Sequence, residues 1–251
     1  MKISAGIDIG SRTIKIVIVE DGVIKNTKKA ENSFDTLKVC KELLKDISYD
    51  FITSTGYGRH LFAEYYPCSV ISEIKAFALG AHHLFPVCRT ILDIGGQDTK
   101  AISIDAKGNL QKFEMNDKCA AGTGRFLEIM AMALRYTLEE FGEKALAADE
   151  SISINSMCTV FAESEVISML ARGAERAKVA RGIHQSIVIR SLALLRRVGL
   201  EEEIMFAGGV AYNKCIINIL EQQIQKNIFI PPDPQIIGAI GAAIFDTKIK
   251  T

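Results

Sequence analysis

Mostly apolar segments separated by short turns dominate the start of the chain. Residues 3–9 are mostly apolar until Asp8, and residues 13–20 are apolar or alternate with polar side chains. Residues 23–28 follow Asp21-Gly22, a pair that is typical of a hairpin turn. These patterns predict three consecutive strands joined by tight turns.

Helices and strands then alternate. The pattern predicts a helix over residues 33–46, capped by Ser33 or Asp35, and a strand over residues 50–55. A short strand and then a helix are predicted within residues 70–84. Strands that alternate with helices predict an α/β fold.

The opening pattern returns later in the chain. Asp93-Ile-Gly-Gly-Gln-Asp-Thr-Lys100 matches Asp8-Ile-Gly-Ser-Arg-Thr-Ile-Lys15 as D-I-G-x-x-x-x-K. The offset is the same at both ends, because 93 minus 8 and 100 minus 15 both give 85. Each copy continues into an apolar strand and a second turn, at Asp21-Gly22 and at Lys107-Gly108. The repeat predicts a duplicated lobe with a cleft between the two halves.

The repeated turns suit the phosphates of a nucleotide. Glycine turns bring backbone N–H groups against phosphate oxygens. An aspartate at each strand end, Asp8 or Asp93, can hold Mg²⁺ directly or through water. Lys15 and Lys100 could neutralise phosphate charge, or they could equally be solvated strand residues.

A third glycine turn follows a later strand. The pattern predicts a strand over residues 203–207, a tight turn at Gly208-Gly209 and a helix over residues 211–226. Such a turn lets the backbone approach a flat ligand such as adenine and ribose. The residues expected to bind the nucleotide are Gly10, Ser11, Arg12, Thr13, Lys15, Gly95, Gly96, Gly208 and Gly209.

Two cysteines lie in similar polar segments, each before a predicted helix. Cys119 lies in MNDKCAAGTGRFLE (residues 115–128), and Cys158 lies in NSMCTVFAESE (residues 155–165). A thiolate beside a helix N-terminus is favoured by the helix dipole and by the free N–H groups. The alternative for each is a structural cysteine in an ordinary loop.

Composition and charge narrow the class of protein. The 251 residues are 48% hydrophobic and 24% charged, which is typical of a globular chain. A formal net charge of zero argues against a nucleic-acid-binding protein. The longest apolar runs are too short to span a bilayer, and the N-terminal strand does not match a signal peptide. The six cysteines include no C-x-x-C pair, so we expect reduced thiols in a cytoplasmic protein.

Two D-I-G hairpins and a late Gly-Gly turn resemble the actin/Hsp70/sugar-kinase superfamily of two-lobed ATPases. More specifically, the chain resembles the BadF/BadG family of ATPases, closest to the activator component of 2-hydroxyacyl-CoA dehydratases. The segments that carry this resemblance are GIDIGS, STGYGR, DIGGQDTK, NDKCAAGTGRFLE, CTVFAESEVI, FAGGVAYN and PQIIGAIGAA. The resemblance implies an α/β fold of two ribonuclease-H-like lobes with an ATP cleft between them. Lobe one would be residues 1–88 plus 234–251, and lobe two residues 89–233.

The resemblance also implies cofactors and partners. They are ATP or ADP, Mg²⁺, and one [4Fe–4S] cluster shared across a homodimer. Such a cluster needs four thiolates, and Cys119 and Cys158 from each of two chains would supply them. A ferredoxin or flavodoxin would deliver one electron, which would pass to a 2-hydroxyacyl-CoA dehydratase. The remaining cysteines are expected to be structural thiols: Cys40, Cys68, Cys88 and Cys215.

Roles are also predicted for several polar residues near these turns and cysteines. The resemblance places Gln97 near the γ-phosphate or the attacking water, as a catalytic residue beside Asp8 and Asp93, although it could instead only cap its turn. Asn116 and Asp117 could bond near the cluster or form an Asx turn. Two carboxylates after Cys158 are predicted to lie in a first helical turn, where a structural role is favoured. They are Glu163 and Glu165.

Two other functions remain open. One is a sugar kinase of the same superfamily, which would use the same cleft with a carboxylate acting as base on a sugar hydroxyl. The other stays within the family: a benzoyl-CoA-reductase-type subunit, or an activator of another double-cluster protein. The paired cysteine segments favour the dehydratase activator over the kinase.

Overall fold

The computed structural model describes residues 2–156 and 158–249, which form an α/β fold with two five-stranded sheets. The first sheet has the order β3-β2-β1-β4-β5 and the second β8-β7-β6-β9-β10. The first contains β1 (Ile3–Ile9), β2 (Thr13–Glu20), β3 (Val23–Glu31), β4 (Phe51–Thr55) and β5 (Ser69–Val70). The second contains β6 (Thr90–Ile94), β7 (Thr99–Ile104), β8 (Leu110–Asn116), β9 (Ile204–Ala207) and β10 (Ile228–Phe229). The α/β class predicted from the sequence is confirmed.

The helices lie between and after these strands. They are α1 (Thr36–Leu44), α2 (Arg59–Tyr65), α3 (Glu73–Leu84), α4 (Gly124–Ala133), α5 (Leu138–Ala147), α6 (Thr159–Ala171), α7 (Arg176–Val198), α8 (Lys214–Ile224) and α9 (Ile237–Ile249). Among the helices that the structure describes, none combines the length and the apolar character needed to cross a membrane.

The two sheets have the same strand order, so the repeat extends well beyond the D-I-G segments. In the first sheet β1 pairs antiparallel with β2 and parallel with β4. Strands β6, β7 and β9 occupy the corresponding places in the second sheet. The last strand pairs are parallel in both, β4 with β5 and β9 with β10. The duplication was inferred from a repeated hairpin, and it covers all five strands of each sheet.

Several element bounds differ from those predicted. The first helix begins at Thr36, because the side chain of Asp35 accepts a hydrogen bond from the N–H of Lys38 and acts as the cap. Helix α2 follows the Gly56 turn and was not predicted. The helix expected over residues 211–226 is in fact a 3₁₀ turn (Gly209–Tyr212) followed by α8, which Asn213 caps.

The chain divides into two compact units. Unit 1 contains residues 1–91, 102–112 and 231–251, and unit 2 contains residues 92–101 and 113–230. The lobe boundaries inferred from the sequence remain predictions, and each unit is described by itself below.

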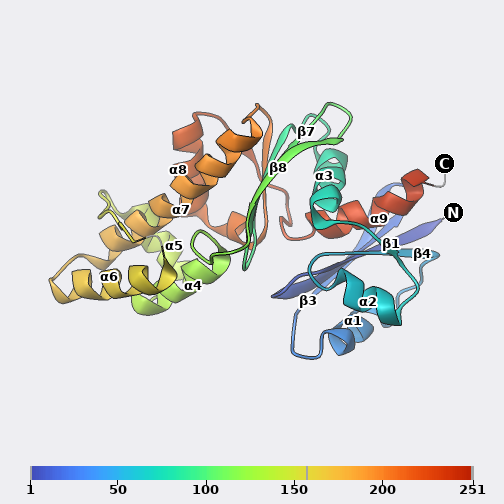
Figure 1. Cartoon of the computed structure of the whole chain (residues 1–251), viewed down its shortest axis with the longest axis horizontal. Coiled ribbons are helices and arrows are strands. Elements are labelled where there is room, and N and C mark those ends of the chain that lie inside the picture. Colours follow the sequence, from blue (N-terminus) through green and yellow to red (C-terminus); the bar gives the residue numbers. More distant parts are fainter. Residues whose placement is uncertain (1, 157, 250–251) are drawn as a thin grey trace. The chain divides into compact units, whose positions relative to one another are not determined.

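Unit 1 is closed by α9, which packs closely against α3 and β1 (Figure 1). Small residues make this approach possible. A Cβ atom on Gly80 would lie 2.1 Å from the carbonyl oxygen of Ile237, and one on Gly6 would lie 2.0 Å from that of Ala239. The hydroxyl of Ser4 in β1 donates to the carbonyl of Ala243 over 2.6 Å. The small-residue run near the C-terminus is therefore a packing helix.

Unit 2 is built around α7, a helix of 23 residues that packs against α5 and α8. Its buried face packs into an apolar core to which α4, α5 and α6 contribute Phe126, Phe141 and Val166. Arg181 of α7 donates to the carbonyls of Ala145 and Leu146 at the end of α5. This scaffold holds the segments that contain Cys119 and Cys158.

Candidate functional site

Asp8 is a buried carboxylate at the end of β1 in unit 1. Its side chain is 4% exposed, and Oδ2 lies 3.2 Å from Nζ of Lys15, its cross-strand partner in β2. Oδ1 is buried and has no hydrogen-bond partner. The neighbouring residue in β4, Thr55, also has a buried hydroxyl without a partner. Buried polar atoms without partners are costly, so this strand end is suited to hold a water molecule or a solvated cation.

Gly56 brings the backbone directly against Asp8. Its φ is +82°, and a Cβ atom there would lie 2.4 Å from Oδ1 of Asp8 and 2.7 Å from the carbonyl oxygen of Ile9. No other residue type fits both the left-handed backbone and this contact. The sequence prediction missed Gly56 as a site residue, although the glycine directly after a buried strand in STGYGR was a usable signal.

The same arrangement recurs in unit 2. Gly208 has a φ of +86°, and its Cβ would lie 2.5 Å from Oδ1 of Asp93 and 2.3 Å from the carbonyl oxygen of Ile94. Gly208 follows β9 as Gly56 follows β4. The Gly-Gly turn predicted to approach adenosine thus also packs against a strand-end aspartate.

Lys100 is a buried ion-pair partner in unit 2. Its side chain is 1% exposed, and Nζ lies 3.1 Å from Oδ2 of Asp93 and 2.7 Å from Oδ2 of Asp98. The solvated alternative for this lysine is therefore wrong. Because desolvated charges are stable only when they are paired, Lys100 and the two carboxylates depend on one another.

The two D-I-G hairpins close in the same way. The N–H of Gly10 donates to the carbonyl of Thr13 over 3.1 Å, and that of Gly95 donates to Asp98 over 2.9 Å. The tips of both turns are exposed, and they carry Ser11, Arg12 and Gln97. Backbone atoms, not the side chain of Gln97, close the second turn.

Hydrogen bonds join the second turn to the Cys119 segment within unit 2. The N–H groups of Gly124 and Arg125 donate to the carbonyls of Gly95 and Gly96, each over 2.9 Å. The hydroxyl of Thr99 donates to the carbonyl of Gly122 over 2.9 Å and is buried. The Gly95-Gly96 turn and the first turn of α4 therefore form one hydrogen-bonded unit.

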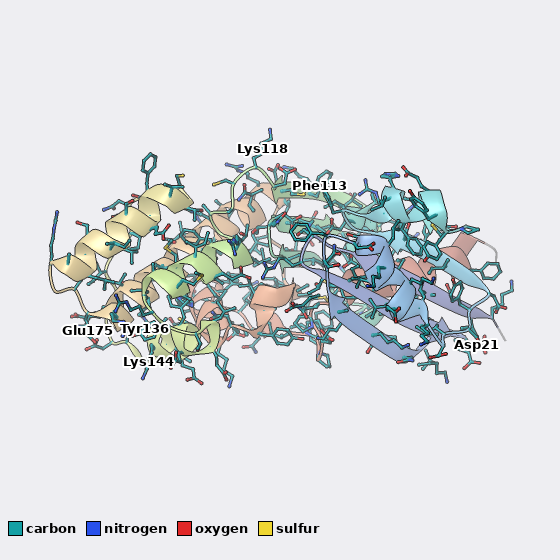
Figure 2. The ribbon with its side chains drawn as sticks, turned by 90° about the horizontal axis from the view of Figure 1, so that it is seen from below. Asp21, Phe113, Lys118, Tyr136, Lys144 and Glu175 are labelled. Carbon is teal, nitrogen blue, oxygen red and sulfur yellow. The ribbon has the colours of Figure 1, made fainter. Side chains whose placement is uncertain are left out.

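Cys119 is exposed in the loop before α4. The cap of α4 is Thr123, four residues further on, so the expectation that Cys119 lies beside a helix N-terminus is wrong and the dipole argument does not apply to it. Asn116 donates to the carbonyls of Cys119 and Ala121 and shapes the loop. Figure 2 shows the neighbouring Lys118 projecting outward.

Cys158 is exposed and is the N-cap residue of α6. The segment before it is held by Glu165, whose carboxylate accepts hydrogen bonds from the N–H groups of Asn155 and Ser156 over 3.1 and 2.8 Å. Burial acts to raise the pKa of Glu165, and the hydrogen bonds from Ser156 and Asn155 outweigh it, so the pKa lies below the ordinary value. Glu163 and Glu165 lie beyond the first turn of α6, contrary to prediction.

The other four cysteines differ from these two. Cys40, Cys88 and Cys215 are buried and Cys68 is partly buried. Burial raises the pKa of the Cys40 and Cys215 thiols to about 11, which makes them poor ligands. Within residues 2–156 and 158–249 no three His, Cys, Asp or Glu side chains cluster as a metal site.

A family model described as the BadF/BadG/BcrA/BcrD ATPase family matches residues 5–245. The chain belongs to this family. Over 96% of its length it is 43% identical to the activator of lactoyl-CoA dehydratase from Anaerotignum propionicum, of which it covers 95%. The resemblance inferred from the sequence motifs is confirmed.

Solved structures of related proteins have the same fold. Component A of (R)-2-hydroxyglutaryl-CoA dehydratase from Acidaminococcus fermentans is 36% identical and matches with a TM-score of 0.93 over 100% of both chains. The activator of 2-hydroxyisocaproyl-CoA dehydratase from Clostridium difficile, solved with bound ADPNP, is also 36% identical, with a TM-score of 0.88 over 99% of this chain and 98% of that one.

A more distant likeness concerns the fold alone. A ROK-family glucokinase from Streptomyces griseus is 13% identical, with a TM-score of 0.61 over 96% of this chain and 98% of that one. It identifies the two-lobed fold of actin-like ATPases and sugar kinases, as the sequence predicted.

In this BadF/BadG-type ATPase, two residues that act through distant contacts were not predicted from the sequence. Thr99 and Arg190 each contact a segment that contains a candidate ligand, at separations of 23 and 34 residues. Thr99 lies inside the D-I-G repeat, which was a usable signal, whereas nothing in the local sequence marks Arg190. Glu165 has the structural role that was favoured for it, as the acceptor for the N–H groups of Asn155 and Ser156.

Proposed function

We propose that this family member is an ATP-dependent one-electron donor that activates a 2-hydroxyacyl-CoA dehydratase. The observation that carries the proposal is the direct hydrogen bonding of the Gly95-Gly96 turn to the first turn of α4, which follows the exposed Cys119. The family membership, the identity to dehydratase activators and the ADPNP bound to one of these relatives support it.

Each D-I-G turn would contribute backbone N–H groups to the phosphates of ATP. Asp8 would hold Mg²⁺ through water, since its Oδ1 is buried and unsatisfied and Thr55 offers a second unsatisfied oxygen beside it. Asp93 is the corresponding carboxylate of unit 2. Gln97, exposed at the tip of the second turn, would orient the attacking water. Gly208 and Gly209 would approach the adenosine.

Cys119 and Cys158 would bind iron. They are the two exposed cysteines of the described chain, and two thiolates per chain fit half of a [4Fe–4S] site. A homodimer would complete the four ligands around a two-fold axis. The cluster would supply one-electron transfer between proteins. A reduced ferredoxin or flavodoxin would lose one electron, and the dehydratase would gain it.

Nucleotide would act on the cysteine segment through the turn. ATP and ADP can shift this segment only if they bind its two arrangements with different affinity. The hydrogen bonds from Gly124 and Arg125 to the carbonyls of Gly95 and Gly96 provide the connection, because any change in the turn moves the acceptors of the first α4 N–H groups.

The test is iron and acid-labile sulfide per chain after anaerobic purification, on protein of known oligomeric mass. About two irons per chain in a dimer is the expected result. Cys119→Ala and Cys158→Ala should each abolish iron binding and leave nucleotide binding intact, whereas the control Cys68→Ala should retain iron. A monomer without iron after anaerobic reconstitution would overturn the electron-donor function, and ATP turnover stimulated by a sugar would then indicate a kinase.

A further inference from the structure

Arg190 of α7 donates to one cysteine segment and lies beside the other. Its Nη2 lies 3.5 Å from the carbonyl oxygen of Ser156, two residues before Cys158. On the other side, its Cδ would lie 3.6 Å from a Cβ atom on Gly122, three residues after Cys119. The guanidinium also lies over the ring of Phe126 in α4, 5.8 Å from its centroid. One side chain thus bonds to the Cys158 segment, lies beside Gly122 of the Cys119 segment, and lies over a ring of the helix that follows Cys119.

The side chain of Arg190 is a partly buried cation. Burial lowers its pKa from the ordinary value, and the charge of Cys119 acts in the opposite direction. A guanidinium remains protonated in proteins despite such a shift. Arg190 therefore places a permanent positive charge 3.5 Å from the carbonyl oxygen of Ser156, two residues before Cys158.

We propose that Arg190 is a positioning residue that ties both cysteine segments to α7 and holds a fixed positive charge beside the cluster ligands. The proposal rests on the proposed function, because it assigns Arg190 a role toward the iron–sulfur cluster bound by Cys119 and Cys158.

Two consequences follow from this placement. Reduction adds one negative charge to the cluster, and a nearby cation stabilises the reduced form, so Arg190 raises the reduction potential. The guanidinium can also donate in several directions at once, whereas an ammonium is a compact point charge. Lysine at this position would retain the charge but not the simultaneous contacts.

The experiment compares Arg190→Gln, Arg190→Lys and the control Arg196→Gln. Arg196 is on the same helix and is exposed, so its replacement removes the same charge away from both segments. In metal-free protein, hydrogen exchange of residues 116–123 and 153–156 should become about fivefold faster in Arg190→Gln, the factor expected from the loss of one ordinary hydrogen bond. The control should exchange as the wild type does.

In anaerobically reconstituted protein the midpoint potential of the cluster is then measured. Arg190→Gln should shift it to more negative values, Arg190→Lys should shift it less, and Arg196→Gln should leave it nearly unchanged. Unchanged exchange and an unchanged potential in Arg190→Gln, with iron bound at the wild-type level, would overturn the proposal and leave the proposed function intact. A wild-type protein that binds no iron would instead overturn the proposed function, and the role of Arg190 with it.

Discussion

The N–H of Gly124 donates to the carbonyl oxygen of Gly95 over 2.9 Å, and Gly124 is the first residue of α4. A Cβ atom on Gly124 would lie 3.1 Å from that oxygen, so glycine allows this approach without a tight contact. The turn at Gly95 and the helix after the Cys119 loop thus meet through main-chain atoms.

Thr99 reinforces this connection. Replacing Thr99 with Val keeps its shape but removes the buried donor to the carbonyl of Gly122, which should cost about 1–2 kcal/mol of unfolding free energy. Urea denaturation measures this loss, and Thr99→Ser is the matched control because it keeps the hydroxyl. Hydrogen exchange of residues 119–123 with and without ADP should show a weaker nucleotide response in Thr99→Val. An equal response in both variants would exclude Thr99 from the connection.

The left-handed glycines differ in what surrounds them. Gly22 and Gly208 have φ values of +82° and +86°, but a Cβ atom on Gly22 meets nothing within 4 Å. Gly22→Ala should therefore cost only the backbone penalty of about 1–2 kcal/mol. Gly208→Ala adds a clash with Ile94 and Asp93, so it should be more destabilising and should weaken nucleotide binding. Equal unfolding midpoints for the two variants would contradict the packing of Gly208 against Asp93.

Lys100 tests the buried ion pair. Lys100→Met removes the buried cation that pairs with Asp93 and should cost about 3–5 kcal/mol. The control is Lys25→Met, because Lys25 is 52% exposed in a surface pair with Glu20 at 3.6 Å and should contribute about 1 kcal/mol or less. Adding Asp93→Asn to Lys100→Met should restore part of the lost unfolding free energy. If the double variant has the same free energy of unfolding as Lys100→Met, or a lower one, the charge of Asp93 is not the cause of the loss.

His184 should make stability depend on pH. Burial is the main cause that lowers its pKa to about 4, and the charge of Arg181 contributes, while the hydrogen bond to the Ala180 carbonyl acts in the opposite direction. Since Oδ1 of Asn213 accepts from Cys215 and Ile216, the amide of Asn213 donates to Nε2 of His184, which must stay unprotonated.

The unfolded chain binds a proton on His184 below about pH 6.5, and the folded chain does so only below about pH 4. Stability therefore falls as pH decreases through this window, by about 3 kcal/mol in total. His184→Gln keeps an acceptor for Asn213 without titrating. The difference in unfolding free energy between wild type and His184→Gln, measured from pH 7 to pH 4, should change by this amount. A constant difference would show that His184 does not titrate in this window.

Local patterns were enough to find the duplicated hairpins and the two exposed cysteines. The D-I-G-x-x-x-x-K repeat predicted both Asp8 and Asp93 at strand ends, because a tight turn after a buried strand has a local signature. Gly56 was missed because its partner Asp8 lies in another strand, and only the parallel pairing of β1 with β4 brings the two together. The helix after Gly208-Gly209 was misplaced because Asn213, a side-chain cap, restarts the helix after a 3₁₀ turn.

The hydrogen bond from Ser4 to the carbonyl of Ala243 joins residues 239 positions apart. A ribosome makes β1 well before α9, so the strand remains uncovered on that side while residues 113–230 of unit 2 are synthesised. Residues 113–230 of unit 2 emerge as one continuous stretch in that interval. The order of synthesis thus lets the segments that contain the cysteines assemble before α9 covers the sheet with Asp8.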